Sequence, residues 1–388
     1  MKIAFLTPEF PHPKMVSAGG IGTSILNLSK GLIGLGHEVS ILVYGQKDDT
    51  FFVENDISFY IIKNIKLSGF SRVLTQRKIE KLINSLVKQS KIDIVEAPDW
   101  TGITSIIKPI CPMIVKLHGS DTYFCHLDSR PVKFWNKFRE KRALQNATAL
   151  LSVSQYTADL TKELFSLERD FTIIPNCIDI NKFSTESATK VEENIILYFG
   201  TLIRKKGLLE LPLIFNEVYK KNNKAKLIVI GRDASDIISG NHSTWAMMQS
   251  LFDVTALKNV NYIGSVAYDE IKAHVSSASV CVFPTFAEAL PVSWIEAMAL
   301  KKAIVASDVG WAAEIIEDSV EGFLVHPKNH NLFADRILEL LDNQKLRNQF
   351  GIEARKKVVQ KFSIEVVAKQ SADFYNKISN EKSYKKNN

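Results

Sequence analysis

The chain has 388 residues, more than one compact hydrophobic core normally organises, so we expect two domains. With 46% hydrophobic and 23% charged residues, its composition is that of globular proteins, which excludes a mainly disordered chain. The net charge of +7 comes without a recognisable nucleic-acid-binding module, so we expect no nucleic-acid partner.

The first residues and the cysteines indicate the compartment. The N-terminus, MKIAFLTPEF, has a short apolar run that is typical of a buried first strand and too short for a signal peptide. No apolar stretch reaches the roughly 18–20 residues that span a bilayer. Four widely spaced cysteines without a C-x-x-C pair are typical of reduced, buried thiols, so we expect a cytoplasmic protein.

Short aliphatic runs alternate with amphipathic segments along the chain. In the first half the expected strands are 2–7, 38–44, 92–97, 113–118, 149–154 and 171–175. In the second half they are 195–200, 226–231, 260–264, 280–284, 303–307 and 322–325. Strand–helix alternation with nearly continuous apolar strands predicts parallel sheets covered by helices on both faces. We therefore predict an α/β protein with two Rossmann-like, doubly wound domains facing a cleft.

Hydrophobic periodicity lapses into polar residues around 180–193, which places the joint between the domains there. The predicted N-terminal domain is 1–183 and the predicted C-terminal domain is 184–362, followed by a helix over 363–380. In such sheets, ligands bind outside the carboxyl ends of the strands. We therefore look for function in the loops that follow strands.

Two segments are strongly basic. Residues 63–91 hold eight basic residues and one acid, and residues 130–142 hold six basic residues and one acid. They form either two solvated helix faces or an attachment to an anionic membrane surface, where each cation contributes about 1 kcal/mol. Phe134, Trp135 and Phe138 lie among the cations of the second segment, which favours the membrane interpretation.

The loop after the first strand is rich in glycine. Gly19, Gly20 and Gly22 let a ligand approach the backbone, and the helix that follows can attract an anion to its N-terminus. A dinucleotide fingerprint would follow the strand directly, whereas here about eleven residues intervene and Ile25 takes the third glycine position. A nicotinamide site is therefore disfavoured, while a glycine-rich turn without a ligand stays open.

Two further loops of the first half carry polar side chains. His118 follows a buried strand, where it can donate a hydrogen bond to a substrate hydroxyl, transfer a proton or serve only the structure. Asp99 follows another strand and could meet an acceptor. No zinc signature is present, so we expect no metal.

Cations follow a strand of the second half in YFGTLIRKKG. Arg204 and Lys206 stand just before Gly207 and a helix, where they could neutralise a diphosphate with the help of the positive helix end. The spacing G-x-x-x-x-G-K-[ST] of a phosphate-binding Walker loop is absent. A solvated basic turn is the alternative.

The stretch EALPVSWIE places Glu288 and Glu296 eight positions apart. Pro291 suits the first turn of a helix, with Glu288 in the approach loop and Glu296 about a turn inside. Eight helical residues span about 12 Å, so the carboxylates could hold the two ends of an extended ligand. A sugar ring and a ribose would suit them, with the amides near Ala289 and Leu290 facing a phosphate. Helix-capping acids are the alternative.

In order and spacing, several motifs resemble the family-4 retaining glycosyltransferases of the GT-B fold (glycosyl transferases group 1). They are GGIGT, HGSD, SVSQYTAD, IPNCID, FGTLIRKKG, VIGRD, YIGSVAYDEI and PTFAEALPVSWIEAMALKKAIVASDVG. The E-x7-E element from Glu288 to Glu296 is the most specific of them. The resemblance implies that a nucleotide sugar docks on the C-terminal domain and an acceptor on the N-terminal domain, and that the final helix packs back onto the first domain.

The resemblance also implies roles for particular residues. Glu288 and His118 would act at the transferred sugar, and Glu296 would hold the ribose. The other implied ligands of the substrates are Gly19, Gly20, Arg204, Lys206, Val266, Ala289, Leu290, Pro291 and Val292. Two positions depart from the family pattern. Thr201 stands where the family often has an arginine, so Arg204 would supply the guanidinium from another position, and Trp311 stands where a second glycine is common.

The resemblance thus implies retaining transfer of a hexose-type sugar from a UDP-, GDP- or ADP-sugar to a saccharide or lipid-linked acceptor. We expect a role in cell-surface polysaccharide or lipopolysaccharide synthesis, without a cofactor, on the inner face of the cell membrane. A nucleotide-sugar epimerase of the same fold and a two-domain solute-binding protein are the alternatives. The absence of a G-x-S-x-G elbow disfavours a serine hydrolase.

Overall fold

The structure, a computed structural model, describes residues 1–16, 19–183 and 191–384. Two compact units make up the chain: unit 1 is Met1–Ile178 with Phe362–Asn388, and unit 2 is Asp179–Lys361. The boundary lies a few residues before the predicted one. Part of the predicted joint (184–190) and two residues of the glycine-rich loop (17–18) lie outside the described residues.

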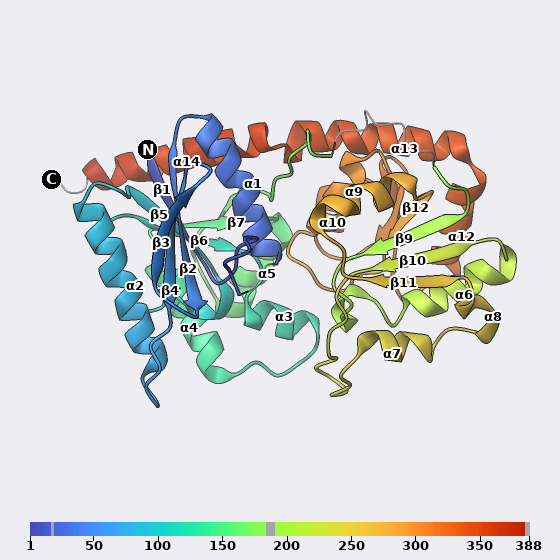
Figure 1. Ribbon diagram of the computed structural model, residues 1–388, viewed down its shortest axis with the longest axis horizontal. Helices are drawn as coiled ribbons and strands as arrows, with labels where there is room; N and C mark the ends of the chain where they lie inside the picture. The colour runs from blue at the N-terminus through green and yellow to red at the C-terminus, as the bar shows by residue number, and fades with distance from the viewer. Residues whose placement is uncertain (17–18, 184–190, 385–388) are drawn as a thin grey trace. The chain divides into compact units, whose positions relative to one another are not determined.

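Unit 1 contains an eight-stranded sheet in the order β3-β4-β2-β1-β5-β6-β7-β8 (Figure 1). Its strands are β1 (Lys2–Thr7), β2 (Glu38–Gln46), β3 (Thr50–Glu54), β4 (Ile57–Lys63), β5 (Ile94–Pro98), β6 (Met113–Leu117), β7 (Ala149–Ser152) and β8 (Thr172–Ile173). All neighbours in the sheet are parallel except β3 and β4. All six strands expected in the first half are present.

The sequence-based prediction does not include β3 and β4, whose antiparallel hairpin adds an edge to the otherwise parallel sheet. Asn55 and Asp56 join the two strands with φ angles of 49° and 61°. A two-residue turn with both φ angles positive matches the right-handed twist of a hairpin and favours Asn and Asp. Two runs rich in β-branched and aromatic residues, joined by an Asn-Asp pair, are therefore a sequence pattern that predicts this hairpin.

Helices cover both faces of the unit 1 sheet because side chains alternate along each strand. The helices are α1 (Gly20–Gly34), α2 (Ser71–Lys88), η1 (Trp100–Gly102), α3 (Asp121–Leu127), α4 (Phe134–Asn146), α5 (Gln155–Phe165) and α14 (Ile364–Tyr384). Ile3 and Phe5 of β1 share a core with α1 and α14, whereas Leu6 faces α2 through Ile79 and Ile83.

The final helix, α14, completes unit 1. Its apolar side chains belong to the same core as those of β1 and α1. Tyr375 is fully buried and donates a hydrogen bond of 2.6 Å from its Oη to Oε2 of Glu96 on β5. Burial raises the pKa of Glu96, although the charge of Lys116 and the Tyr375 hydroxyl partly offset this rise.

Unit 2 contains a wholly parallel six-stranded sheet in the order β11-β10-β9-β12-β13-β14. Its strands are β9 (Ile195–Phe199), β10 (Lys226–Ile230), β11 (Val260–Gly264), β12 (Val280–Phe283), β13 (Ile304–Ser307) and β14 (Gly322–Val325). Its helical segments are η2 (Arg204–Lys206), α6 (Leu211–Lys221), α7 (Thr244–Gln249), α8 (Val254–Leu257), α9 (Tyr268–Ser277), α10 (Val292–Ala299), α11 (Ala312–Ile315), α12 (His330–Asp342), α13 (Gln344–Lys357) and the π-helix η3 (Val358–Phe362), which leads into unit 1.

These two α/β units with doubly wound parallel sheets confirm the predicted fold class. The four cysteines are buried and none of them is in a disulfide, as expected. Among the described helices, none is both long and apolar enough to cross a bilayer.

The contact between α1 and α14 can be tested with two glycines of α1. A Cβ on Gly31 would lie 2.5 Å from Ile364 Cγ2 and 2.6 Å from the Cβ of Ala368, whereas a Cβ on Gly34 would meet nothing within 4 Å. We expect Gly31→Ala to lower the free energy of unfolding by about 1–3 kcal/mol through overpacking. Gly34→Ala, the matched control, should leave it unchanged or raise it by up to about 1 kcal/mol.

Urea unfolding followed by circular dichroism measures both variants. Equal stabilities of the two variants would contradict the close packing of α14 on α1.

Candidate active site

Three loops of unit 2 leave the same edge of its sheet, because β9, β10 and β12 are parallel and end side by side. Gly200 and Gly231 follow β9 and β10 with φ angles of 144° and 148°. A Cβ on Gly231 would lie 1.9 Å from the carbonyl oxygen of Gly200. Only glycine permits this approach, so the two loops are held in direct contact.

The cation loop after β9 is fixed against the loop after β12. Gly207 has a φ of 73°, and a Cβ there would lie 1.7 Å from the carbonyl oxygen of Pro284. The amides of Phe286 and Ala287 donate hydrogen bonds of 2.8 and 3.1 Å to the carbonyl oxygen of Lys205. The backbone therefore brings the segment 204–206 next to the approach loop of α10.

Lys206 and Glu288 meet as a result of this contact. The Nζ of Lys206 lies 2.9 Å from Oε1 of Glu288, and the two side chains are 22% and 17% exposed. Burial alone would raise the pKa of Glu288, but the charges of Lys206 and Lys205 and the hydrogen bond from Lys206 outweigh it and lower the pKa. Glu288 is thus an ionised carboxylate at neutral pH, in a site partly screened from solvent.

Arg204 has a different partner. Its Nε and Nη2 donate hydrogen bonds of 2.9 and 2.7 Å to the carboxylate of Asp236, whose side chain is 3% exposed. The hydrogen bond from Arg204 holds the pKa of Asp236 well below its usual range, with Ser239 contributing. In the tight turn of η2, side chains two positions apart point in different directions. The structure therefore places Lys206, and not Arg204, beside Glu288.

The helix α10 begins one residue later than its sequence suggested. Pro291 is the residue before the helix, with φ −72° and ψ 114°, and the first helical residue is Val292. The segment from Glu288 to Pro291 is not helical, so the helical rise of about 12 Å does not apply between Glu288 and Glu296. Glu296 lies a little over one turn inside α10, where its position in the sequence placed it. Its side chain is buried, with 6% exposed.

The other predicted donor ligands lie at the same edge of unit 2. Ala289 and Leu290 are buried in the turn before α10. Val266 is half-buried in the loop between β11 and α9.

In unit 1, a carboxylate that the sequence-based prediction overlooks occupies the N-terminus of α1. Oε1 of Glu9 accepts hydrogen bonds of 3.0 and 3.3 Å from the amides of Ile21 and Gly22. A Cβ on Gly19 would lie 2.4 Å from Oε2 of Glu9, whereas a Cβ on Gly20 would meet nothing within 4 Å. The space over Gly20 stays open to a ligand. No spacing rule links Glu9 to a helix twelve residues later.

Asp99 and His118, at the ends of β5 and β6, are brought together. The backbone N–H of His118 donates a hydrogen bond of 2.9 Å to Oδ1 of Asp99. Burial and the charge of Lys116 lower the pKa of His118 to about 3, so its imidazole is neutral at physiological pH. Burial raises the pKa of Asp99 to about 7, and the hydrogen bond from His118 offsets only part of this rise. A neutral imidazole can donate or accept a hydrogen bond but carries no charge.

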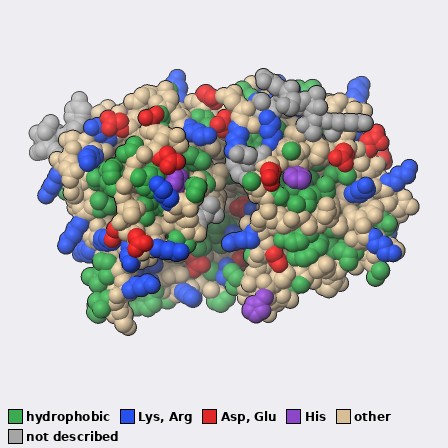
Figure 2. Space-filling view, viewed as in Figure 1, with side chains coloured by type: hydrophobic (Ala, Val, Ile, Leu, Met, Phe, Trp, Pro, Cys, Tyr) green, Lys and Arg blue, Asp and Glu red, His purple; other side chains and the backbone are tan. Residues whose placement is uncertain are grey.

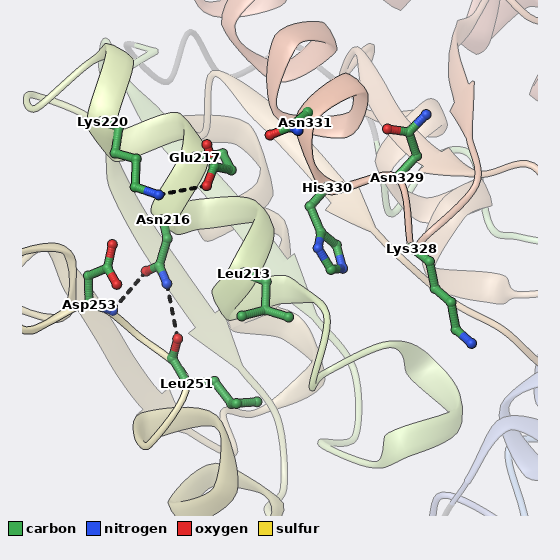
Figure 3. A pocket seen from close by; sticks show the side chains of 10 residues that line it. All are labelled: Leu213, Asn216, Glu217, Lys220, Leu251, Asp253, Lys328, Asn329, His330 and Asn331. Carbon is green, nitrogen blue, oxygen red and sulfur yellow. Dashed lines mark hydrogen bonds and ion pairs between the residues drawn. The ribbon is translucent and has the colours of Figure 1, made fainter.

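A cavity of about 470 Å³ lies elsewhere on unit 2, between α6, the loop before α8 and the start of α12 (Figure 3). Asn216 lines it and joins α6 to the loop before α8: its side chain accepts a hydrogen bond from the amide of Asp253 and donates one to the carbonyl oxygen of Leu251, both 3.0 Å long. None of the predicted site residues lines this cavity. Within the described residues, no group of three His, Cys, Asp or Glu side chains is arranged to hold a metal ion.

Comparison with known proteins gives the family. Residues 179–357 match the model described as Glycosyl transferases group 1, and residues 18–182 match the model described as Glycosyltransferase Family 4. The chain is a glycosyltransferase of this group. This confirms the resemblance carried by the motifs, and the enzyme class with it.

Relatives in sequence are also named as glycosyltransferases, and solved structures share the fold. An uncharacterized glycosyltransferase of Methanocaldococcus jannaschii is 26% identical, over 97% of this chain and 98% of its own length. The capsular polysaccharide biosynthesis glycosyltransferase CapM of Staphylococcus aureus is 27% identical, over 61% of this chain and 63% of its own length. Sucrose-phosphate synthase of Thermosynechococcus elongatus shares the fold, with a TM-score of 0.79, 18% identity and coverage of 97% and 99%. Anabaena HepE in complex with UDP and glucose also shares the fold, with a TM-score of 0.75 and 15% identity. The match covers 97% of this chain and 100% of that one.

The raised pKa of Asp99 predicts a pH-dependent stability. Its folded pKa, about 7, lies above the ordinary value, so ionisation of Asp99 opposes folding. This penalty is small near pH 4, grows up to about pH 7 and is constant above that. We therefore expect Asp99→Asn to stabilise the glycosyltransferase increasingly as the pH rises from about 4 to about 7, and by a constant amount above that.

Urea unfolding at a series of pH values measures this difference. The control is Asp170→Asn, because the Asp170 side chain is 99% exposed. A stability difference between Asp99→Asn and wild type that does not change with pH would contradict the buried, protonated state of Asp99.

Proposed function

We propose that this glycosyltransferase moves a hexose-type sugar from a nucleoside-diphosphate sugar to a saccharide or lipid-linked acceptor, with retention of the anomeric configuration. One observation carries the proposal: the ammonium of Lys206 lies 2.9 Å from the carboxylate of Glu288 at the carboxyl ends of β9 and β12. It is an anion-binding group and a hydroxyl-binding group side by side.

A nucleotide sugar needs such a pair, because its sugar ring and its β-phosphate are joined through a single oxygen. Glu288, as an ionised carboxylate, can accept hydrogen bonds from sugar hydroxyls. Lys206 offers a compact positive charge to the adjacent diphosphate. When the donor binds, Lys206 exchanges part of its interaction with Glu288 for one with phosphate. The same two groups can therefore hold both sides of the bond that breaks.

In the proposed reaction, the bond between the anomeric carbon and the diphosphate oxygen breaks, and its electron pair leaves with the nucleoside diphosphate. Lys206 stabilises the charge that develops on this leaving group, and the carboxylate of Glu288 faces an oxocarbenium-like ring. The acceptor oxygen attacks on the same face of the ring, and its proton passes to the departing diphosphate oxygen. The chain supplies the positive charge itself, so we propose a reaction without a metal.

The donor is a UDP-, GDP- or ADP-sugar in this proposal. A UDP-sugar has the most support, because the neighbour of similar fold, HepE, is described in complex with UDP and glucose. Glu296 is proposed to hold the ribose and Val266 to contact the base, while the roles of His118 at the donor sugar and Asp99 at the acceptor stay predictions. The name of CapM supports a product in cell-surface polysaccharide. We propose a cytoplasmic enzyme at the inner face of the membrane.

The role of Glu288 is tested by kinetics. We expect Glu288→Ala to lower turnover by about two to four orders of magnitude, as the loss of one catalytic acid–base or electrostatic group does. The fold should be retained, because Glu288 lies in a loop outside the sheet core. The control is Glu339→Gln, which alters only a surface contact with Arg336. Wild-type turnover by folded Glu288→Ala protein would remove Glu288 from the mechanism.

The donor is identified by thermal stabilisation. A donor that binds only the native state raises its melting temperature, by an amount set by its concentration relative to its dissociation constant. We expect one class among UDP-, GDP- and ADP-sugars to do so, and Lys206→Met to abolish most of the shift. Equal shifts for Lys206→Met and wild type would show that Lys206 does not hold the diphosphate.

A further inference from the structure

The start of α4 exposes a cluster of aromatic side chains. Phe134, Trp135 and Phe138 are 72%, 60% and 47% exposed. Their rings contact one another, with centroid distances of 5.4, 6.5 and 6.0 Å. Isolated exposed apolar residues are normal, but a contiguous aromatic patch on a helix indicates a surface that is covered by a partner.

Most of the cations around this cluster form no ion pair with any acid that the structure describes in unit 1. Glu140, the single acid of α4, is 1% exposed and points inward, where it accepts hydrogen bonds from Asp121 and Thr122. Of the six basic residues in 130–142, Arg130 pairs with Asp128 at 3.0 Å. The other five are Lys133, Lys137, Arg139, Lys141 and Arg142. Among the described residues, none of these five forms an ion pair, and Arg139 lies 5.8 Å from the ring centroid of Trp135. The outer face of α4 is therefore aromatic and uniformly positive.

The second basic segment, 63–91, is different. Among the described residues, three of its eight cations form ion pairs within unit 1: Lys63 with Asp48, Lys78 with Asp49 and Arg77 with Glu80. The start of α2 also exposes apolar side chains. Leu67, Phe70 and Val73 are 54%, 63% and 45% exposed. The two basic segments therefore differ in the structure, with three ion-paired cations in 63–91 and one, Arg130, in 130–142.

Contacts within unit 1 make these two surfaces neighbours. Arg72, in the first turn of α2, donates a hydrogen bond from Nη2 to the backbone oxygen of Thr101 in η1. Gly102, the next residue of η1, has a φ of 61° and lies so close to Arg139 of α4 that a Cβ would be 2.4 Å from its carbonyl carbon. Trp100 of η1 is 37% exposed. In Figure 2, hydrophobic and basic side chains gather where α2 and α4 lie in Figure 1.

We propose that these residues form one docking face for an anionic lipid surface: the aromatic cluster and cations of α4 with the apolar start of α2. Trp135 has a polar N–H edge that favours the headgroup region, and Phe134 and Phe138 add apolar surface. Lysines that form no ion pair within the protein gain most from anionic headgroups. This inference rests on the proposed function in one respect: a lipid-linked acceptor would lie in the membrane surface to which the enzyme docks. The structure thereby assigns the main membrane contact to 130–142 and an apolar, secondary contact to the start of α2.

Vesicle co-sedimentation of the full chain tests the face without using catalysis. The probes are vesicles of phosphatidylcholine with phosphatidylglycerol and vesicles of phosphatidylcholine alone. We expect wild-type protein to bind the anionic vesicles and to bind the neutral ones far more weakly. Reversing the charge of Lys133, Lys137 and Lys141 to Glu should weaken binding to anionic vesicles at least about a hundredfold. Changing Phe134, Trp135 and Phe138 to Ser should weaken binding to both vesicle types.

Matched controls separate the face from general charge and hydrophobicity. Lys224, Lys258 and Lys345 of unit 2 are exposed, and changing them to Glu makes the same change in net charge. Ile237, Ile238 and Val254, which are 78%, 55% and 79% exposed, provide the control for the change to Ser. Both control variants should bind like wild type.

The proposal is overturned if wild-type protein ignores anionic vesicles, if the α4 variants bind unchanged, or if the unit 2 controls lose as much affinity. Circular dichroism and the thermal shift with the donor report whether the α4 variants stay folded. These outcomes are independent of the transfer reaction. Failure of the Glu288 experiment would therefore leave the vesicle result standing, and failure of vesicle binding would leave the transfer reaction standing.

Discussion

The carbonyl oxygen of Pro284 occupies the place that a side chain at position 207 would need, and the site of unit 2 depends on this steric constraint. Because residue 207 is glycine, the loop after β9 can lie directly on the loop after β12. The amides that follow Pro284 then bond to the cation loop, and Lys206 reaches Glu288. The chemistry of the site therefore rests on backbone packing between two parallel strands, and its charged side chains take positions that this packing has already fixed.

The chain's own carboxylates hold the groups that we expect to bind anions. Glu288 holds Lys206, Asp236 holds Arg204, and Glu9 holds the N-terminus of α1. These contacts satisfy polar groups that would otherwise be poorly solvated in partly buried positions. An anionic ligand must exchange with a carboxylate, and the ease of exchange differs with burial: the Glu288 side chain is 17% exposed and that of Asp236 is 3% exposed.

Much of this could be predicted from the sequence. Continuous apolar runs gave twelve strands and the two-unit fold, since parallel strands buried on both faces need apolar side chains throughout. The loops that hold Lys206, Glu288 and His118 followed from their positions after strands. The Asn55-Asp56 hairpin was readable but overlooked. The sequence does not predict that Asp236 pairs with Arg204 or that Glu9 caps α1, because both contacts depend on how distant loops fold. The burial of Glu140 and the pairing of the cations in 63–91 likewise depend on tertiary contacts.

The position of α14 has a consequence for synthesis on the ribosome. Unit 2 is one continuous stretch of chain, whereas unit 1 needs residues from both sides of it. The two passages of the chain meet within unit 1, where Ile178 accepts a hydrogen bond from Ile364 and donates one to Phe362. Until α14 emerges, the core that β1 shares with α1 lacks the apolar side chains of α14, and Glu96 lacks the hydroxyl of Tyr375. The first domain to be translated is thus the last to be completed, and the part of its apolar core that α14 covers stays exposed while unit 2 is being made.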